Sequence, residues 1–117
     1  MKKILVAEDN DSNYILMSYI LRKYYAYDRA KNGQEAVEKV KSGDFDMVLM
    51  DIKMPVMDGL EATTAIREFN QEIPIVALTA NAFDSDRQQA MEAGCDAFLS
   101  KPVSASDCLQ TIEKFLK

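Results

Sequence analysis

The chain contains no histidine and only two cysteines. Without histidine, a Ser-His-Asp triad, most zinc sites and a role as a phosphohistidine carrier are excluded. If the protein takes part in phosphoryl transfer from a histidine, a partner protein must therefore supply that histidine. Cys95 and Cys108 do not form a CxxC pair, so we expect buried or half-buried thiols in a reducing compartment rather than a disulfide.

The sequence also lacks an excess of positive charge and any long apolar segment. Its net charge is −5, whereas a general nucleic-acid-binding surface would be basic. No apolar stretch approaches the roughly 20 residues of a membrane span. Met1-Lys2-Lys3 runs directly into a short apolar segment, which is not the pattern of a signal peptide. We therefore expect a cytoplasmic protein that binds neither nucleic acid nor membrane directly.

What is present is an alternation of short apolar runs with amphipathic segments. The 117 residues fit one domain, 1–117, and the 48% of hydrophobic residues suffice for a core. Alternation of this kind is typical of βαβ units around a parallel sheet. Strands are predicted near residues 3–7, 27–30, 46–50, 74–78 and 97–99. The pattern therefore predicts an α/β fold, a three-layer sandwich of five strands and five helices.

The helices are placed by apolar periodicity and capping residues. The first is predicted to run from an N-cap at Asp11 or Ser12 to about Tyr24, with Leu16, Ile20 and Tyr24 on one apolar stripe flanked by Met17 and Leu21. The other four are expected to begin after Gly33, near Asp58, after Asp84 and after Pro102.

Polar side chains follow four of the predicted strands at the point where each strand ends. Asp51 closes the third apolar run, Glu8 and Asp9 follow the first, and Thr79 and Lys101 follow the fourth and fifth. The carboxyl ends of parallel strands share one edge of the sheet, where open α/β folds bind ligands. Carboxylates suit a magnesium ion, and a hydroxyl with an ammonium group suits phosphoryl oxygens.

Asp51 is the candidate nucleophile of this edge. A carboxylate can attack phosphorus to give an acyl phosphate, and an adjacent dication offsets charge in the transition state. A cis Lys101–Pro102 bond, which Xaa-Pro sequences permit, would aim Lys101 inward. Phe98 has two interpretations, as a plain core residue or as a ring whose rotamer depends on Thr79.

Four strings occur in order between Lys3 and Leu116: ILVAEDN, MDIKMPVMDG, PIVALTANA and AGCDAFLSKPV. Together they resemble the receiver domain of two-component response regulators and hybrid histidine kinases, most of all the receivers of hybrid kinases and phosphorelays. The resemblance implies a (βα)5 flavodoxin-like fold with strand order 2-1-3-4-5. The chain would be a stand-alone receiver or a segment of a larger protein, such as the cytoplasmic part of a membrane-bound hybrid kinase.

The resemblance also implies a role for each acid of the sheet edge. Asp51 matches the phospho-accepting aspartate. Asp9 matches a direct magnesium ligand, and Glu8 a ligand that acts through water. Asp51 and the backbone carbonyl of Lys53 would complete the Mg²⁺ site. Glu8 stands where the family more often has aspartate, which keeps the charge.

The remaining implied roles concern phosphate binding and switching. Thr79 and Lys101 match the phosphate-contacting pair, and Phe98 occupies the aromatic switch position without the hydroxyl of a tyrosine. A sensor histidine kinase or a histidine phosphotransfer domain would donate the phosphoryl group to Asp51, and slow self-catalysed hydrolysis would remove it. Such a protein is a signalling phosphoacceptor and acts on no separate substrate. A downstream protein would read the altered face of the fourth helix, fifth strand and fifth helix.

Three alternatives remain open at this point. A haloacid dehalogenase-type enzyme would need a second acid two residues after the nucleophile, where this chain has Lys53. A flavodoxin-like cofactor binder would need a phosphate-binding loop, whereas residues 8–11 are acidic and would repel a phosphate without a metal. A receiver that binds partners without being phosphorylated would keep the fold alone.

Lys53 and Asn81 each follow a key residue by two positions, Asp51 and Thr79, so we expect both to flank the path of attacking water. Replacing Lys53 with alanine should therefore change the dephosphorylation rate severalfold, because a long side chain there shields or contacts the acyl phosphate. The decay of phosphorylated protein measures this rate. An unchanged rate in the variant would contradict the expectation.

Overall fold

The computed structural model describes residues 1–80 and 84–116. Within these residues, strands and helices alternate strictly along the chain. The elements are β1 (Lys3–Ala7), α1 (Asp11–Leu21), β2 (Ala26–Ala30), α2 (Gly33–Ser42), β3 (Met47–Asp51), α3 (Gly59–Arg67), β4 (Ile75–Thr79), α4 (Asp84–Ala93), β5 (Ala97–Ser100) and α5 (Ala105–Leu116). The strands form one parallel sheet in the order β2-β1-β3-β4-β5, which confirms the predicted flavodoxin-like fold.

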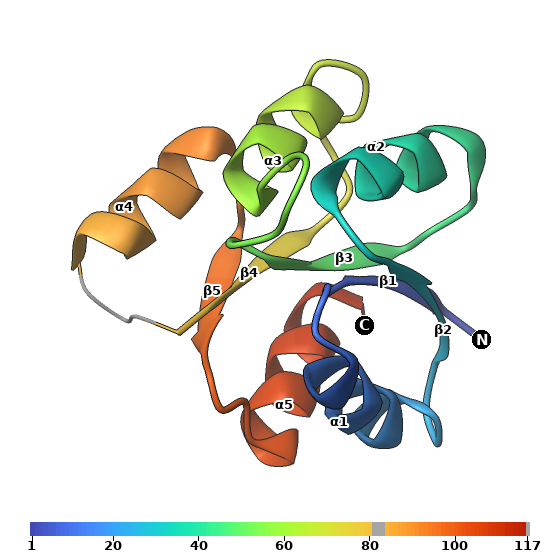
Figure 1. The fold of residues 1–117 in the computed structure, drawn as a ribbon. Helices are drawn as coiled ribbons and strands as arrows, with labels where there is room; N and C mark the ends of the chain where they lie inside the picture. The colour runs from blue at the N-terminus through green and yellow to red at the C-terminus, as the bar shows by residue number, and fades with distance from the viewer. Residues whose placement is uncertain (81–83, 117) are drawn as a thin grey trace.

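Helices cover both faces of the sheet. α1 and α5 lie on one face, and α2, α3 and α4 lie on the other (Figure 1). Side chains of a strand alternate between faces, so Ile4 and Val6 pack toward α1 and α5, whereas Leu5 and Ala7 pack toward the opposite layer. Burial on both faces explains why β1, β3 and β4 read as unbroken apolar runs.

The first turn of α1 differs from the prediction. Its N-cap is Asn10, whose side chain accepts a hydrogen bond from the Asn13 amide at 3.0 Å, so the assignment of Asp11 or Ser12 as N-cap is wrong. Asp11 instead lies in the first turn, where the positive end of the helix dipole favours an acidic residue.

The end of α1 and part of its apolar stripe also differ from the prediction. The helix ends at Leu21, whose carbonyl oxygen accepts the amides of both Tyr24 and Tyr25 at 2.9 Å. This turn leaves Tyr24 58% exposed, and Leu16 is 45% exposed, so neither belongs to the buried stripe. That stripe consists of Met17, Ile20 and Leu21.

The segment after Asp51 is fixed by the start of α3. Asp58 caps this helix through a reciprocal capping box with Glu61. Gly59 packs so closely against the end of β3 that a Cβ atom there would overlap the Asp51 carbonyl oxygen. Only glycine permits this close approach, which packs the start of α3 against the backbone of Asp51.

Both cysteines are buried, and burial raises the pKa of each thiol, that of Cys108 to about 11. At pH 8 both thiols therefore stay protonated and shielded from solvent. Because the thiolate is the reactive form of cysteine, both should react slowly. We expect neither to react with iodoacetamide in the native protein, and both to react in denaturant. Mass spectrometry of the alkylated protein checks this. Rapid native alkylation of either cysteine would contradict the structure.

Candidate functional site

The polar residues that follow the strands meet at one end of the sheet. Asp51 is the last residue of β3 and Thr79 the last of β4, while Glu8 and Lys101 come directly after β1 and β5. Together with Asp9 they line one hollow of about 240 Å³, which also contains Lys53. We call this hollow the acidic pocket. The structure therefore brings together all of the residues that the sequence placed at this edge.

Lys101 is shared between two buried carboxylates. Its ammonium nitrogen lies 2.9 Å from Glu8 Oε1 and 3.1 Å from Asp51 Oδ2. The side chains of Glu8 and Asp51 are only 1% and 8% exposed, so both pairs are shielded from solvent. The Lys101–Pro102 peptide bond is cis, as expected from the sequence.

The ionisation of the pocket reflects this crowding. Burial and hydrogen bonding with Asp51 raise the pKa of Glu8, against the opposing effect of Lys101. Burial lowers the pKa of Lys101, but its hydrogen bond to Glu8 and the charge of Asp51 outweigh burial, so that the net shift is upward. The ammonium form of Lys101 is thus secured, while the negative charge on the acids is only partly balanced.

Backbone amides complete the support of these carboxylates. The Lys53 amide donates to Asp51 Oδ1 and the Asn10 amide to Glu8 Oε2, each at 3.3 Å. The Lys53 side chain is exposed at the mouth of the pocket. Thr79 is 6% exposed. Asn81, which the sequence led us to expect beside the path of attacking water, lies outside the described residues.

Three carboxylates of the pocket fit a metal ion. Glu8, Asp9 and Asp51 each offer one oxygen, and these oxygens lie within 4.8 Å of one another. Opposite ligands of an octahedral Mg²⁺ are about 4.2 Å apart, since each bond is about 2.1 Å. Asp9 is exposed and free to close a difference of this size. All three donors are carboxylate oxygens, the hard ligands that Mg²⁺ prefers. Their summed negative charge exceeds the single positive charge of Lys101, so the pocket is suited to attract a dication.

Two arginines touch the site's supporting residues, and sequence reasoning did not identify either. Arg29 of β2 donates to the carbonyl oxygens of Glu8 and Asp9, at 3.0 and 3.2 Å. Arg87 of α4 lies over the Phe98 ring, 4.5 Å from its centroid. Charged residues within or beside an amphipathic segment look like ordinary surface positions, so no sequence signal pointed to them.

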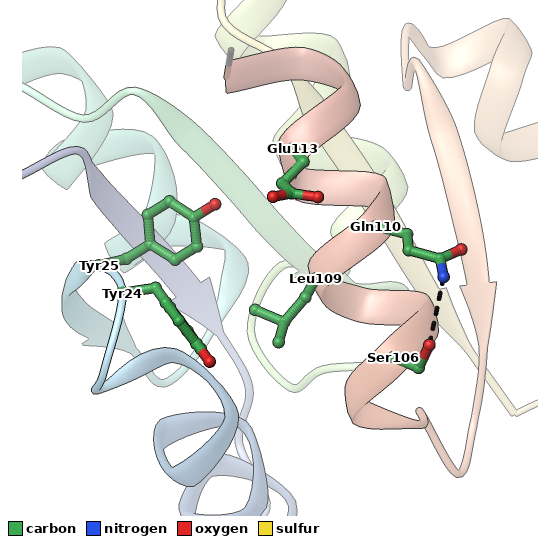
Figure 2. Close-up of a pocket in the computed structure, with 6 residues that line it drawn as sticks. All are labelled: Tyr24, Tyr25, Ser106, Leu109, Gln110 and Glu113. Atoms are coloured by element: carbon green, nitrogen blue, oxygen red, sulfur yellow. Dashed lines mark hydrogen bonds between the residues drawn. The ribbon is translucent and has the colours of Figure 1, made fainter.

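A second hollow is larger but lacks comparable chemistry. It measures about 310 Å³ and lies between Tyr24 and Tyr25 on one side and α5 on the other (Figure 2). Among the described residues that line it, Glu113 is the one acid, and Ser106 and Gln110 are hydrogen-bonded to each other at 3.3 Å. Convergent charged groups rather than size distinguish a reactive site, so the acidic pocket remains the candidate.

Residues 4–113 match the response regulator receiver domain family. The chain is 45% identical to hybrid signal transduction histidine kinase B of Dictyostelium discoideum, in an alignment 131 positions long. The alignment covers 99% of this chain but 7% of that protein. It is 33% identical to the polar-differentiation response regulator DivK of Brucella anthropi, covering 98% of this chain and 96% of DivK. The chain spans only 4–13% of the several hybrid and sensor kinases that it resembles.

Solved structures agree with these relatives. The receiver domain of sensor histidine kinase PA1611 from Pseudomonas aeruginosa, which has a magnesium ion in its active-site cleft, is 33% identical with a TM-score of 0.92, covering 97% of this chain and 96% of that one. The receiver of Ssk1 from Saccharomyces cerevisiae, solved with the histidine phosphotransfer protein Ypd1, is 35% identical with a TM-score of 0.92, covering 97% and 88%.

The chain therefore belongs to the receiver domain family of two-component and phosphorelay signalling. Receiver domains are signalling phosphoacceptors rather than enzymes that act on a separate substrate. Among the described residues, no helix is long and apolar enough to cross a membrane.

Proposed function

We propose that Asp51 accepts a phosphoryl group from the phosphohistidine of a partner protein, in a reaction that depends on Mg²⁺. The observation that carries this proposal is the buried Asp51 carboxylate, which shares Lys101 with Glu8 and lies beside Asp9. The partner must supply the histidine because the chain has none. The magnesium ion of the PA1611 receiver and the Ypd1 partner of the Ssk1 receiver support both parts of the proposal.

The transfer step is a displacement at phosphorus. A carboxylate oxygen of Asp51 bonds to phosphorus while the phosphorus–nitrogen bond to the partner's imidazole breaks. Lys101 and Thr79 would bind oxygens of the transferred group, and Glu8, Asp9, Asp51 and the Lys53 carbonyl oxygen would hold Mg²⁺. When bound, the ion offsets negative charge that develops in the transition state. Later attack of water on the acyl phosphate would release inorganic phosphate and restore Asp51.

The proposed output begins at Thr79 and Phe98. Phe98 is half-buried and lines a groove of about 330 Å³ between α4 and α5, whose other lining residues are Arg87, Met91, Asp96, Ala97, Thr111, Lys114 and Phe115. Its ring therefore borders this groove while it also packs against the core layer on the α2–α4 side of the sheet. Movement of Thr79 toward a phosphoryl group would open space for the ring to turn inward, and the groove would change shape. This face would then bind a downstream protein, by a population shift between two packings.

Phosphorylation itself tests the proposed function. After incubation with Mg²⁺ and acetyl phosphate, the intact mass should increase by one phosphoryl group, because the Asp51 carboxylate lies beside the metal-binding acids Glu8 and Asp9 and within reach of Lys101. EDTA and the Asp51→Asn substitution should each abolish the adduct. Folded protein that gains no adduct would instead be a binding module with the receiver fold. An adduct on the Asp51→Asn variant would mean that another residue is the nucleophile.

Arg87 provides a test of the switch, since its guanidinium lies over the Phe98 ring in this unphosphorylated, or outward, arrangement. Such a contact at an exposed site contributes about 0.5–1 kcal/mol, so Arg87→Ala should raise the ratio of inward to outward rings about two- to fivefold. Side-chain NMR couplings of Phe98 in the unphosphorylated protein measure this ratio. Arg87→Lys, which keeps a cation, should have the smaller effect. Equal rotamer populations in all three proteins would refute the contact's role.

A further inference from the structure

Arg29, on the edge strand β2, makes two contacts with the segment that carries Glu8 and Asp9 and two with the start of α1. Its Nε donates to the Glu8 carbonyl oxygen at 3.0 Å and its Nη2 to the Asp9 carbonyl oxygen at 3.2 Å. Its Nη1 pairs with Asp11 at 2.9 Å, and its guanidinium carbon lies 4.6 Å from the Tyr14 ring centroid. The side chain is 16% exposed, so these contacts form a packed arrangement.

The two carbonyl oxygens belong to the peptide groups on either side of the Asp9 Cα. Because peptide groups are planar, a residue has only two soft backbone torsions. Holding both neighbouring peptide groups therefore fixes both backbone torsions of Asp9, and with them the direction of its Cα–Cβ bond, from which the carboxylate swings. Within residues 1–80 and 84–116 no hydrogen bond reaches the Asp9 carboxylate itself, which is exposed. The aim of this carboxylate into the acidic pocket thus depends on its backbone.

We propose that Arg29 is a positioning residue for the metal site: its guanidinium holds residues 8–10 in the conformation that presents Asp9 to Mg²⁺. This rests on the proposed function, in which Glu8, Asp9 and Asp51 hold the ion. An arginine suits the task because its planar fork reaches several acceptors at fixed angles while stacking on a ring. Its positive charge alone would repel a dication, so its contribution comes through geometry.

The substitution Arg29→Lys separates geometry from charge. It retains the positive charge, so the repulsion of Mg²⁺ by residue 29 stays, but a single ammonium group cannot hold both carbonyl oxygens and Asp11 and also stack on Tyr14. We expect the Kd for Mg²⁺ to rise about three- to tenfold. This is below the roughly 10- to 100-fold typical of groups that orient metal ligands, because the Glu8 and Asn10 amides still anchor the loop.

Arg67 offers a matched control within the same chain. Its Nε and Nη1 also donate to two carbonyl oxygens, of Gly94 and Asn70, and its Nη2 also pairs with an acid, Asp96. Its side chain is 17% exposed, against 16% for Arg29. Arg67 does not line the acidic pocket. Arg67→Lys should therefore lower thermal stability by a similar amount and leave the Kd for Mg²⁺ unchanged.

A second variant keeps the proposal testable if Arg29→Lys fails to fold. Tyr14→Leu removes the ring beneath the guanidinium without altering any charge. We expect it to weaken Mg²⁺ binding in the same direction, by a smaller factor than Arg29→Lys. Each Kd comes from titrating the full chain with MgCl₂ while following backbone amide NMR shifts of Asp9, Asn10 and Lys53. Amide hydrogen exchange of Asp9 and Asn10 without metal should be faster in both Arg29→Lys and Tyr14→Leu.

The outcomes separate this inference from the proposed function. Weaker Mg²⁺ binding in Arg29→Lys but not in Arg67→Lys supports the positioning role. Equal affinity in wild type and Arg29→Lys overturns it, and so does an equal loss in both lysine variants, which would reflect stability alone. In either case Mg²⁺ binding by the wild type leaves the proposed function intact. A wild-type protein that does not bind Mg²⁺ overturns both.

Discussion

The acidic pocket depends on the ammonium group of Lys101. Glu8 and Asp51 have almost no exposed side-chain surface, and removing an ionised carboxylate from water costs several kcal/mol. One ammonium group within 3.1 Å of both acids offsets part of that cost. It balances only one of two buried negative charges, and Asp9 adds a third at the rim. Burial first, and the neighbouring Asp51 second, raise the pKa of Glu8 against the opposing effect of Lys101. The fold therefore keeps uncompensated negative charge in one place, which is the electrostatic condition for attracting a dication.

The content of the pocket was predictable because it follows from one geometric rule. The carboxyl ends of parallel strands meet at one edge of a sheet, and Asp51, Thr79 and Lys101 each end or follow an apolar run that only a buried strand explains. Recognising the runs was therefore enough to bring these residues together. The start of α3 was equally readable, since Asp58 three residues before Glu61 forms a local capping box. Features that depend on neighbouring residues alone can be read from the chain.

Features that depend on packing between elements could not be read in this way. In α1, Leu16 is exposed although Met17 beside it is buried. The helix carries apolar residues on more than one side, so periodicity placed the centre of the inward face one position away from where it lies. Arg29 reaches the carbonyl oxygen of Glu8 across 21 positions of sequence. No local pattern distinguishes an arginine that will stack on an aromatic ring from one that stays in solvent.

Strand alternation also explains how one site could affect both layers of the sandwich. Side chains two positions apart on a strand point to the same face of the sheet. Ile4 and Val6 point toward α1 and α5, and so does Glu8, two positions after Val6. Met47 and Leu49 point the same way, and so does Asp51, two positions after Leu49. Phe98 pairs with Ala77, two residues before Thr79, so ring and hydroxyl share the opposite face with α3 and α4. A phosphoryl group on Asp51 that also accepted a hydrogen bond from the Thr79 hydroxyl would connect the two faces of the sheet at its edge. Charge introduced on the α1–α5 side would thereby act on the layer that contains Arg87 and Phe98, without any strand having to move.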